Sequence, residues 1–228
     1  MSHANATITF QSKVTSDLIA EYLRDRILDG TFAPSTNINE VQLATSLNIS
    51  RGPVREAVQR LVQEGLLVSA RNRGTFVVDL GPQDIEDLYK ARNAIEREAG
   101  RLVLRSTDTS QLISQLAEVL HEMSLAIKEN RWRDVAGSDL KFHEAIVAAT
   151  RSTRLQKMFS TLAAETLLCV RQFQHVYERQ ETILDQHQRL LDLLQAGDED
   201  AYLAEIDWHL NHSPQQLAKH HLQPAPAK

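Results

Sequence analysis

Asp139 and His143 are four residues apart in a segment with helical periodicity, so both side chains project from one face of a helix. His187 lies in the middle of a later helical segment, and His209 lies on the last one. Three imidazoles and a carboxylate from three helices can converge inside a helical bundle, as metal ligands do. The alternative is that these side chains are unrelated, because an isolated helical histidine is more often a surface or core residue than a ligand.

A set of three nitrogen ligands and one oxygen ligand suits divalent zinc, nickel, manganese or iron. The preference of imidazole and the order of affinities among these metals favour zinc without settling the metal. His212 follows His209 by three residues and is a second candidate for the last ligand.

The other group of side chains with a chemical role is basic. The window 51–73 holds five arginines and two glutamates, on a chain whose net charge is −5. Residues 1–80 carry eight basic and eight acidic side chains, so the acidic excess lies entirely beyond them. A small basic stripe on an acidic protein is typical of a DNA-reading surface. A solvated helix face that carries arginines by chance is the alternative.

Three of these arginines lie in the last of three predicted helical segments, and the other two lie in the predicted turn that follows. Apolar residues recur at helical spacing over 14–28, a short helix is predicted over about 40–47 after the N-cap Asn39, and a third runs from Arg51 to about Glu64 after the N-cap Ser50. Two strands, 66–70 and 75–80, then enclose a turn. Three helices followed by a two-stranded hairpin predict a winged helix-turn-helix.

From Gly81 onward the pattern is helical to the end. Six amphipathic helices are predicted, which make an all-α antiparallel bundle and a mainly α protein. Their ranges are 82–105, 110–130, 132–150, 153–175, 177–196 and 199–216. The domains expected are a loose arm (1–10), a DNA-binding domain (11–80), a helical ligand-binding and dimerisation domain (81–222) and a disordered tail (223–228). With one cysteine, no signal peptide and no apolar span, a cytoplasmic protein is expected, with no membrane partner.

In a helix-turn-helix the third helix lies in the major groove, with its N-terminal residues on base edges. Arg51 and Arg55 share one face there and suit bidentate contacts to guanine. Ser50 and the helix N-terminus suit a phosphate, and Arg60 is either a phosphate contact or a plain surface residue. In the wing, Gly74 lets the backbone approach DNA closely. The predicted DNA contacts are Ser50, Arg51, Arg55, Arg60, Arg71, Arg73, Gly74 and Thr75.

This first domain resembles the GntR family of bacterial regulators. The resemblance is carried by DRILDGTFAP, NEVQLATSLNISRGPVREAVQRLVQEGLL and RNRGTFV. The family usually has Pro-Gly after the first helix, whereas this chain has Pro34 and Ser35, so we expect the turn to differ there.

The second domain resembles the FadR C-terminal domain of the FCD type. The matching stretches are DIEDLYKARNAIEREAGRL, SDLKFHEAI, DQHQRLLDLL and IDWHLNH. Six helices rather than seven resemble the VanR-like subgroup. The resemblance implies a metal site at Asp139, His143, His187 and His209, and it favours His209 over His212 because the family ligand precedes a leucine, here Leu210.

The resemblance also places Arg92 toward the ligand cavity. A buried guanidinium needs an anion or an acidic side chain, so Arg92 and the metal could together hold a small organic acid as effector. The alternative is an ion pair between Arg92 and Glu96 on the helix surface.

The sequence therefore predicts a transcriptional regulator, expected to be a repressor, rather than an enzyme. The resemblance implies a homodimer on a palindromic double-stranded operator, with affinity controlled by an organic acid at the metal. One alternative is a regulator that senses the metal itself. Another is a metal-dependent hydrolase, although no general base stands beside the proposed site, since Glu144 points about 100° away from its neighbour His143 on the helix.

Overall fold

The computed structural model describes residues 4–172 and 181–221, and the chain divides into two compact units, Met1–Asp79 and Leu80–Lys228. The division falls one residue before the boundary expected from the sequence. No helix in these described ranges is long and apolar enough to cross a membrane.

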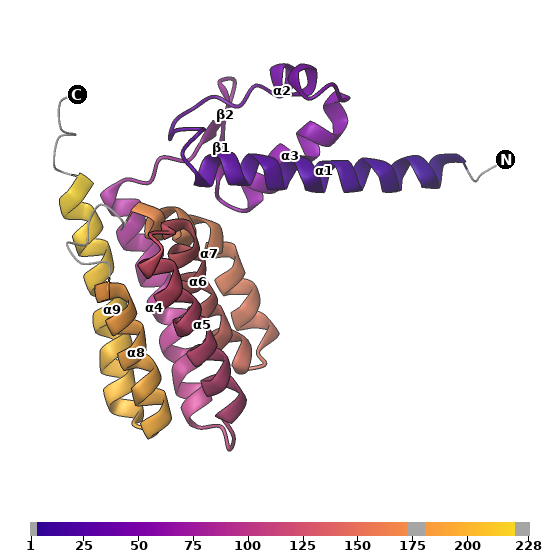
Figure 1. Cartoon of the computed structure of the whole chain (residues 1–228). Helices are drawn as coiled ribbons and strands as arrows, with labels where there is room; N and C mark the ends of the chain where they lie inside the picture. The colour runs from indigo at the N-terminus through magenta and orange to yellow at the C-terminus, as the bar shows by residue number, and fades with distance from the viewer. Residues whose placement is uncertain (1–3, 173–180, 222–228) are drawn as a thin grey trace. The chain divides into compact units, whose positions relative to one another are not determined.

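The first unit is a winged helix-turn-helix (Figure 1). Its elements are α1 (Ala4–Leu28), α2 (Glu40–Ser46), α3 (Arg51–Gln63), β1 (Leu67–Ala70) and β2 (Gly74–Val77). Asn39 caps α2 as predicted, because its side-chain oxygen accepts hydrogen bonds from the backbone N–H groups of Val41 and Gln42. Ser50 occupies the N-cap position of α3 but its side chain makes no capping hydrogen bond.

The first helix is longer than the sequence indicated. It begins at Ala4, so residues 4–10 continue the helix rather than forming the loose arm that was expected. The segment from Ala4 to Leu28 contains neither proline nor glycine, so no residue in it stops the helix. Residues 1–3 lie outside the described residues.

The core of this unit forms where α1 packs against α3. Val54, Val58 and Leu61 are buried, so α3 turns its apolar face inward and leaves the opposite face to solvent. Pro53 lies in the first turn of α3, where a missing N–H breaks no helical hydrogen bond. This packing holds the N-terminus of α3 at the surface.

The wing is an antiparallel hairpin in which Leu67 pairs with Val77 and Ala70 with Gly74. Its strands are shorter than predicted, and Gly74 lies in β2 rather than in the turn. Asn72 adopts a left-handed conformation (φ 61°), which closes the three-residue turn between the strands.

The turn at Ser35 keeps a conformation that favours glycine. Ser35 has φ 63°, its N–H donates to the carbonyl of Val77, and its hydroxyl donates to Asp79. The serine therefore does not force this position out of the left-handed region, in contrast to the difference that the sequence led us to expect.

The second unit is a bundle of the six predicted helices (Figure 1). They are α4 (Pro82–Leu104), α5 (Ser110–Lys128), α6 (Trp132–Ala149), α7 (Thr153–Gln172), α8 (Glu181–Ala196) and α9 (Glu199–His221). The last helix continues through Pro214 and ends five residues beyond the predicted end. The expected end of the fourth helix of this unit, the start of the fifth and the tail at 223–228 lie outside the described residues.

Within the bundle, α4 packs against α9, α6 and α7, while α8 packs against α5 and α9. The interior is mostly aliphatic, with residues such as Leu116, Met123 and Leu190 fully buried. It also encloses a group of charged and titratable side chains, which is unusual because burying such groups is costly unless they are paired.

Candidate functional site

The buried polar group draws on four helices of the bundle. Its members are at most 4% exposed and come from α4, α6, α8 and α9, and they are Arg92, Glu96, Asp139, His143, His187 and His209. The four-residue spacing of Asp139 and His143 places both on the inner face of α6, as predicted.

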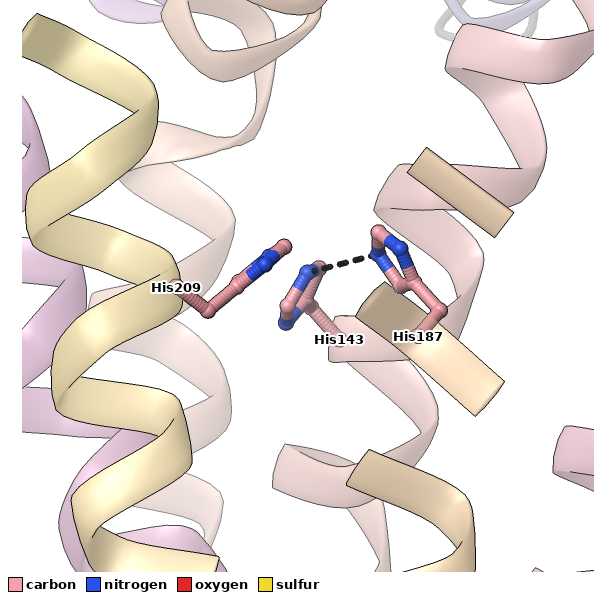
Figure 2. A group of neighbouring side chains, drawn as sticks. All are labelled: His143, His187 and His209. Atoms are coloured by element: carbon pink, nitrogen blue, oxygen red, sulfur yellow. Dashed lines mark hydrogen bonds between the residues drawn. The ribbon is translucent and has the colours of Figure 1, made fainter. Parts of the chain in front are cut away.

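The three histidine rings meet in one place. The Nε2 atoms of His143 and His187 are 3.2 Å apart, and ligand atoms from these two rings and His209 all lie within 4.8 Å of one another. Figure 2 shows the three rings turned toward one another, and their centroids are 4.9 to 5.3 Å apart in all three pairs. Phe142 packs edge-on against the ring of His187, with centroids 4.9 Å apart, and so closes the cluster on one side.

In His187 and His143, the group beside Nδ1 determines which ring nitrogen carries the proton, and therefore whether Nε2 has a free lone pair. Nδ1 of His187 lies 2.7 Å from the carbonyl oxygen of Ile183, which can only accept, so this nitrogen carries the proton. Nδ1 of His143 lies 2.5 Å from a carboxylate oxygen of Glu96, which favours a proton there too. In the neutral rings, both Nε2 atoms then present lone pairs to each other.

Asp139 adds a third acceptor. Its Oδ1 lies 3.3 Å from Nε2 of His187, and its Oδ2 is buried without a hydrogen-bond partner among the described residues. Burial alone would raise the pKa of Asp139, but the contact with the imidazole of His187 and the positive charge of Arg92 hold that pKa well below its usual range. A cation placed among these acceptors, either a proton or a metal ion, satisfies all of them.

The arrangement fits a metal ion. Two nitrogen ligands of a tetrahedral zinc ion lie roughly 3.3 Å apart, given zinc–nitrogen distances of about 2.0–2.1 Å. The separation of 3.2 Å between the two Nε2 atoms is close to this value. His143, His187 and His209 are therefore residues that could hold a divalent ion. Asp139, the fourth predicted ligand, lies outside this converging group but contacts it at His187.

Burial keeps two of these rings neutral, the form that binds metal. It lowers the pKa of His143, although the carboxylate of Glu96 opposes the shift. Burial also lowers the pKa of His209 to well below its usual value, and the neighbouring rings of His187 and His143 add to the effect. His212, the second candidate for the last ligand, lies outside the cluster and stacks on the exposed ring of Trp208.

Arg92 lies beside the cluster and is paired. Its Nε donates to Glu96 across 2.7 Å, and its guanidinium lies 4.9 Å from the centre of the Tyr89 ring. The ion pair between Arg92 and Glu96, which was the alternative expected from the sequence, therefore forms, but inside the bundle rather than on the helix surface. Nη2 of Arg92 is buried and has no hydrogen-bond partner in the described part of the chain.

Glu96 was not among the site residues predicted from the sequence. Its carboxylate lies between Arg92 and His143, and the charge of Arg92 together with the contact to His143 lowers its pKa although burial alone would raise it. The spacing of four residues from Arg92 was the available signal, but that spacing is equally typical of surface ion pairs.

The predicted DNA contacts lie on the surface of the first unit. Arg51 and Arg55 are exposed at the start of α3, as is Ser50 before it. Arg71 and Arg73 are exposed in the wing turn, and Thr75 follows as a half-buried residue. None of these four arginines forms an ion pair with another residue that the structure describes, so their guanidinium groups are available to phosphates or bases.

Two other predicted contacts have partners within the protein. Arg60 binds Asp17 (2.6 Å) and Glu64 (3.1 Å), so its side chain is engaged with acidic neighbours. Gly74 has φ 105°, and a Cβ there would lie 2.8 Å from Nδ2 of Asn37. The glycine is therefore required by the wing itself, whatever its distance to DNA.

The fold and these two sites together define a two-domain, DNA-binding regulator. Residues 15–77 match the bacterial regulatory proteins of the gntR family, and residues 87–212 match the FCD domain. The chain belongs to the GntR family of transcriptional regulators and carries an FCD domain.

Several known proteins resemble the whole chain. The HTH-type transcriptional regulator YdhC of Bacillus subtilis is 31% identical, with 88% of this chain and 89% of YdhC covered. The gluconate operon transcriptional repressor of Bacillus licheniformis is 28% identical over 82% of this chain and 79% of its own. The crystal structure of a GntR regulator from Rhodococcus sp. RHA1 superposes with a TM-score of 0.76 and 26% identity, covering 90% of this chain and 97% of that one.

Proposed function

We propose that this regulator is a homodimeric repressor whose operator affinity is controlled by a small carboxylate bound at a metal ion in the bundle. The observation that carries the proposal is the convergence of buried acceptors at His143, His187 and Asp139, with His209 beside them. Acceptors that face one another in a dry interior are unfavourable unless a cation lies between them.

Zinc is the metal we propose, since imidazole nitrogens and one carboxylate are ligands that zinc prefers. Nickel, manganese and iron fit the same donor set less selectively. With four protein ligands, zinc would bind a carboxylate as a fifth ligand, which requires it to expand from four-coordinate to five-coordinate geometry. When bound, the metal would supply a fixed positive charge for an anionic effector.

Arg92 would be the second contact for the effector. Its buried Nη2 still has hydrogen-bonding capacity, and a guanidinium binds carboxylates through paired N–H groups. One relative is named for repression of a gluconate operon, and gluconate is a carboxylate. This name supports repression, and it connects a relative with an operon for an organic acid.

On the DNA side, Arg51 and Arg55 would read base edges in the major groove, while Ser50 and the wing arginines would contact the backbone. Two copies of the chain would place two recognition helices on the two halves of a palindromic operator. The exposure of these arginines supports this assignment.

One observation favours a second function, in which the metal itself is the signal. Arg92 already has a counterion in Glu96, so the bundle needs no organic anion to balance its charge. In that case, zinc alone would change operator affinity.

Operator binding measured by fluorescence anisotropy tests these proposals. We expect chelator-treated protein to ignore carboxylates such as gluconate and citrate, and zinc-loaded protein to respond to at least one of them. A response to zinc without any acid would instead support the metal sensor. Failure to bind zinc, tested by titration of the chelated protein, would contradict both.

Arg92→Lys refines the test. The lysine keeps a cation beside Glu96 but loses the forked guanidinium, so we expect zinc binding to persist and the response to the acid to weaken. An unchanged response would remove Arg92 from the effector site.

A further inference from the structure

Glu96 contacts the two functional residues of the bundle at once. One oxygen, Oε1, accepts from Nε of Arg92 at 2.7 Å. The other, Oε2, lies 2.5 Å from Nδ1 of His143. Both partners are about 1% exposed and Glu96 is 2% exposed, so water does not replace either contact.

We infer that Glu96 is a positioning residue, which fixes the ring of His143 with its proton on Nδ1 and thereby presents the Nε2 lone pair to the metal. This inference rests on the proposed metal site. A histidine ligand bound through one nitrogen commonly donates its other N–H to a carboxylate, which sets the tautomer and the ring orientation. Nδ1 of His143 and Oε2 of Glu96 lie 2.5 Å apart, at angles outside those of a regular hydrogen bond, and neither atom has a hydrogen-bond partner among the described residues.

The two rings on either side of the site are held in different ways. His187 is oriented by its own helix, through the carbonyl of Ile183 one turn earlier. Nδ1 of His143 has no backbone acceptor among the residues that the structure describes, and its nearest polar neighbour is the carboxylate of Glu96 on α4. Only His143 should therefore lose its preferred tautomer when α4 is altered.

Arg92 completes the arrangement. Its Nε–H holds Oε1, so the carboxylate cannot turn both oxygens toward His143. The arginine proposed for the effector and the histidine proposed for the metal thus share one carboxylate. A displacement of Arg92 would therefore alter the orientation of His143 through the carboxylate of Glu96, and a displacement of His143 would alter Arg92 in the same way.

The experiment compares zinc affinity and histidine tautomers in the full chain. Long-range ¹H–¹⁵N spectra of the metal-free protein at pH 8 distinguish protonated from unprotonated ring nitrogens, and His143→Asn assigns the signals. In the wild type we expect the proton of His143 on Nδ1. In Glu96→Gln, whose amide can donate as well as accept, we expect a mixture of tautomers and a zinc Kd raised about 10- to 100-fold.

Glu98→Gln is the matched control, since Glu98 lies on the same helix and pairs with Arg101 at the surface. It should change neither measurement. Because Glu96→Gln leaves Arg92 buried without its counterion, the double variant Arg92→Leu with Glu96→Gln removes both charges and guards against misfolding. It should show the same tautomer mixture.

Each outcome separates the two hypotheses. Unchanged zinc affinity or an unchanged His143 tautomer in Glu96→Gln would overturn the positioning role. If the wild type binds no zinc, the proposed metal site fails, while the tautomers still test whether Glu96 orients His143.

Discussion

Arginine occurs in two contrasting environments in this protein. In the first unit, Arg51, Arg55, Arg71 and Arg73 are exposed and form no ion pair with other described residues. In the second unit, Arg92 is 1% exposed and bound to Glu96. The exposed arginines are available to a partner outside the chain. The buried one is part of the internal structure, so its removal affects folding before it affects function.

The largest effect expected is on the stability of the bundle. Arg92→Ala leaves the carboxylate of Glu96 buried without its counterion, which should lower the free energy of unfolding by about 3–5 kcal/mol. Both tryptophans, Trp132 and Trp208, lie in this unit, so urea unfolding followed by tryptophan fluorescence reports on it alone. Arg97→Ala is the control, because the half-exposed pair of Arg97 with Asp207 should contribute at most about 1 kcal/mol. Equal losses in the two variants would contradict the contrast.

The next effect concerns DNA. Arg55→Ala removes an exposed guanidinium and should weaken operator binding by about 1–3 kcal/mol, or roughly 5- to 150-fold in Kd. The bundle should unfold at the same urea concentration as in the wild type. Anisotropy of a labelled operator gives the Kd, and Arg154→Ala, an exposed arginine of the second unit, controls for the loss of one positive charge. A similar loss in Arg154→Ala would show that only net charge matters.

The buried histidines predict a dependence of stability on pH. The pKa values of His143 and His209 are lower in the folded protein than the ordinary value of about 6.5. As pH falls below 6.5, the unfolded chain therefore takes up protons that the folded chain does not. In EDTA, each histidine should then lower the stability by up to about 1.4 kcal/mol per pH unit, until its folded pKa is reached. Urea midpoints at pH 7.5, 6.5 and 5.5 measure this, and a midpoint that rises on acidification would contradict it.

The smallest effect expected is at Arg60, the exposed arginine that is already paired. Its contacts with Asp17 and Glu64 are at the surface, so Arg60→Ala should change the stability of the first unit by less than about 1 kcal/mol. Operator affinity should fall by less than in Arg55→Ala, because this guanidinium is engaged with acidic neighbours. The same anisotropy assay compares the two variants. If Arg60→Ala weakens operator binding as much as Arg55→Ala does, Arg60 is a DNA contact.

Much of the fold could be predicted because its signals are local. The helical spacing of apolar residues predicted the six bundle helices, and Asn39, as an N-cap residue, predicted the start of α2. The end of α9 was predicted five residues too early, although the predicted range already included Pro214, because residues 217–221 carry no glycine or proline that marks where the helix ends. The start of α1 was also missed, because a polar segment can be helical or irregular on local grounds alone.

The site was predictable only in part, for a physical reason. His209 and His212 lie on the same helix, and the packing of α9 against its neighbours determines which of them is buried. The same holds for Arg92 and Glu96, whose spacing fits either a surface pair or a buried one. Residue type and spacing identified the candidates, but burial depends on contacts between helices that are distant in sequence.

The single cysteine of the chain offers a practical advantage. Cys169 is fully buried, and burial raises the pKa of its thiol to about 12, so the reactive thiolate is scarce at neutral pH. Thiol-directed probes should therefore leave the native chain unlabelled. A cysteine introduced in the wing and another on the bundle surface could carry spin labels in an otherwise unmodified protein. Distances between such labels, measured with and without zinc, would show whether the separation of the two units changes when zinc is added.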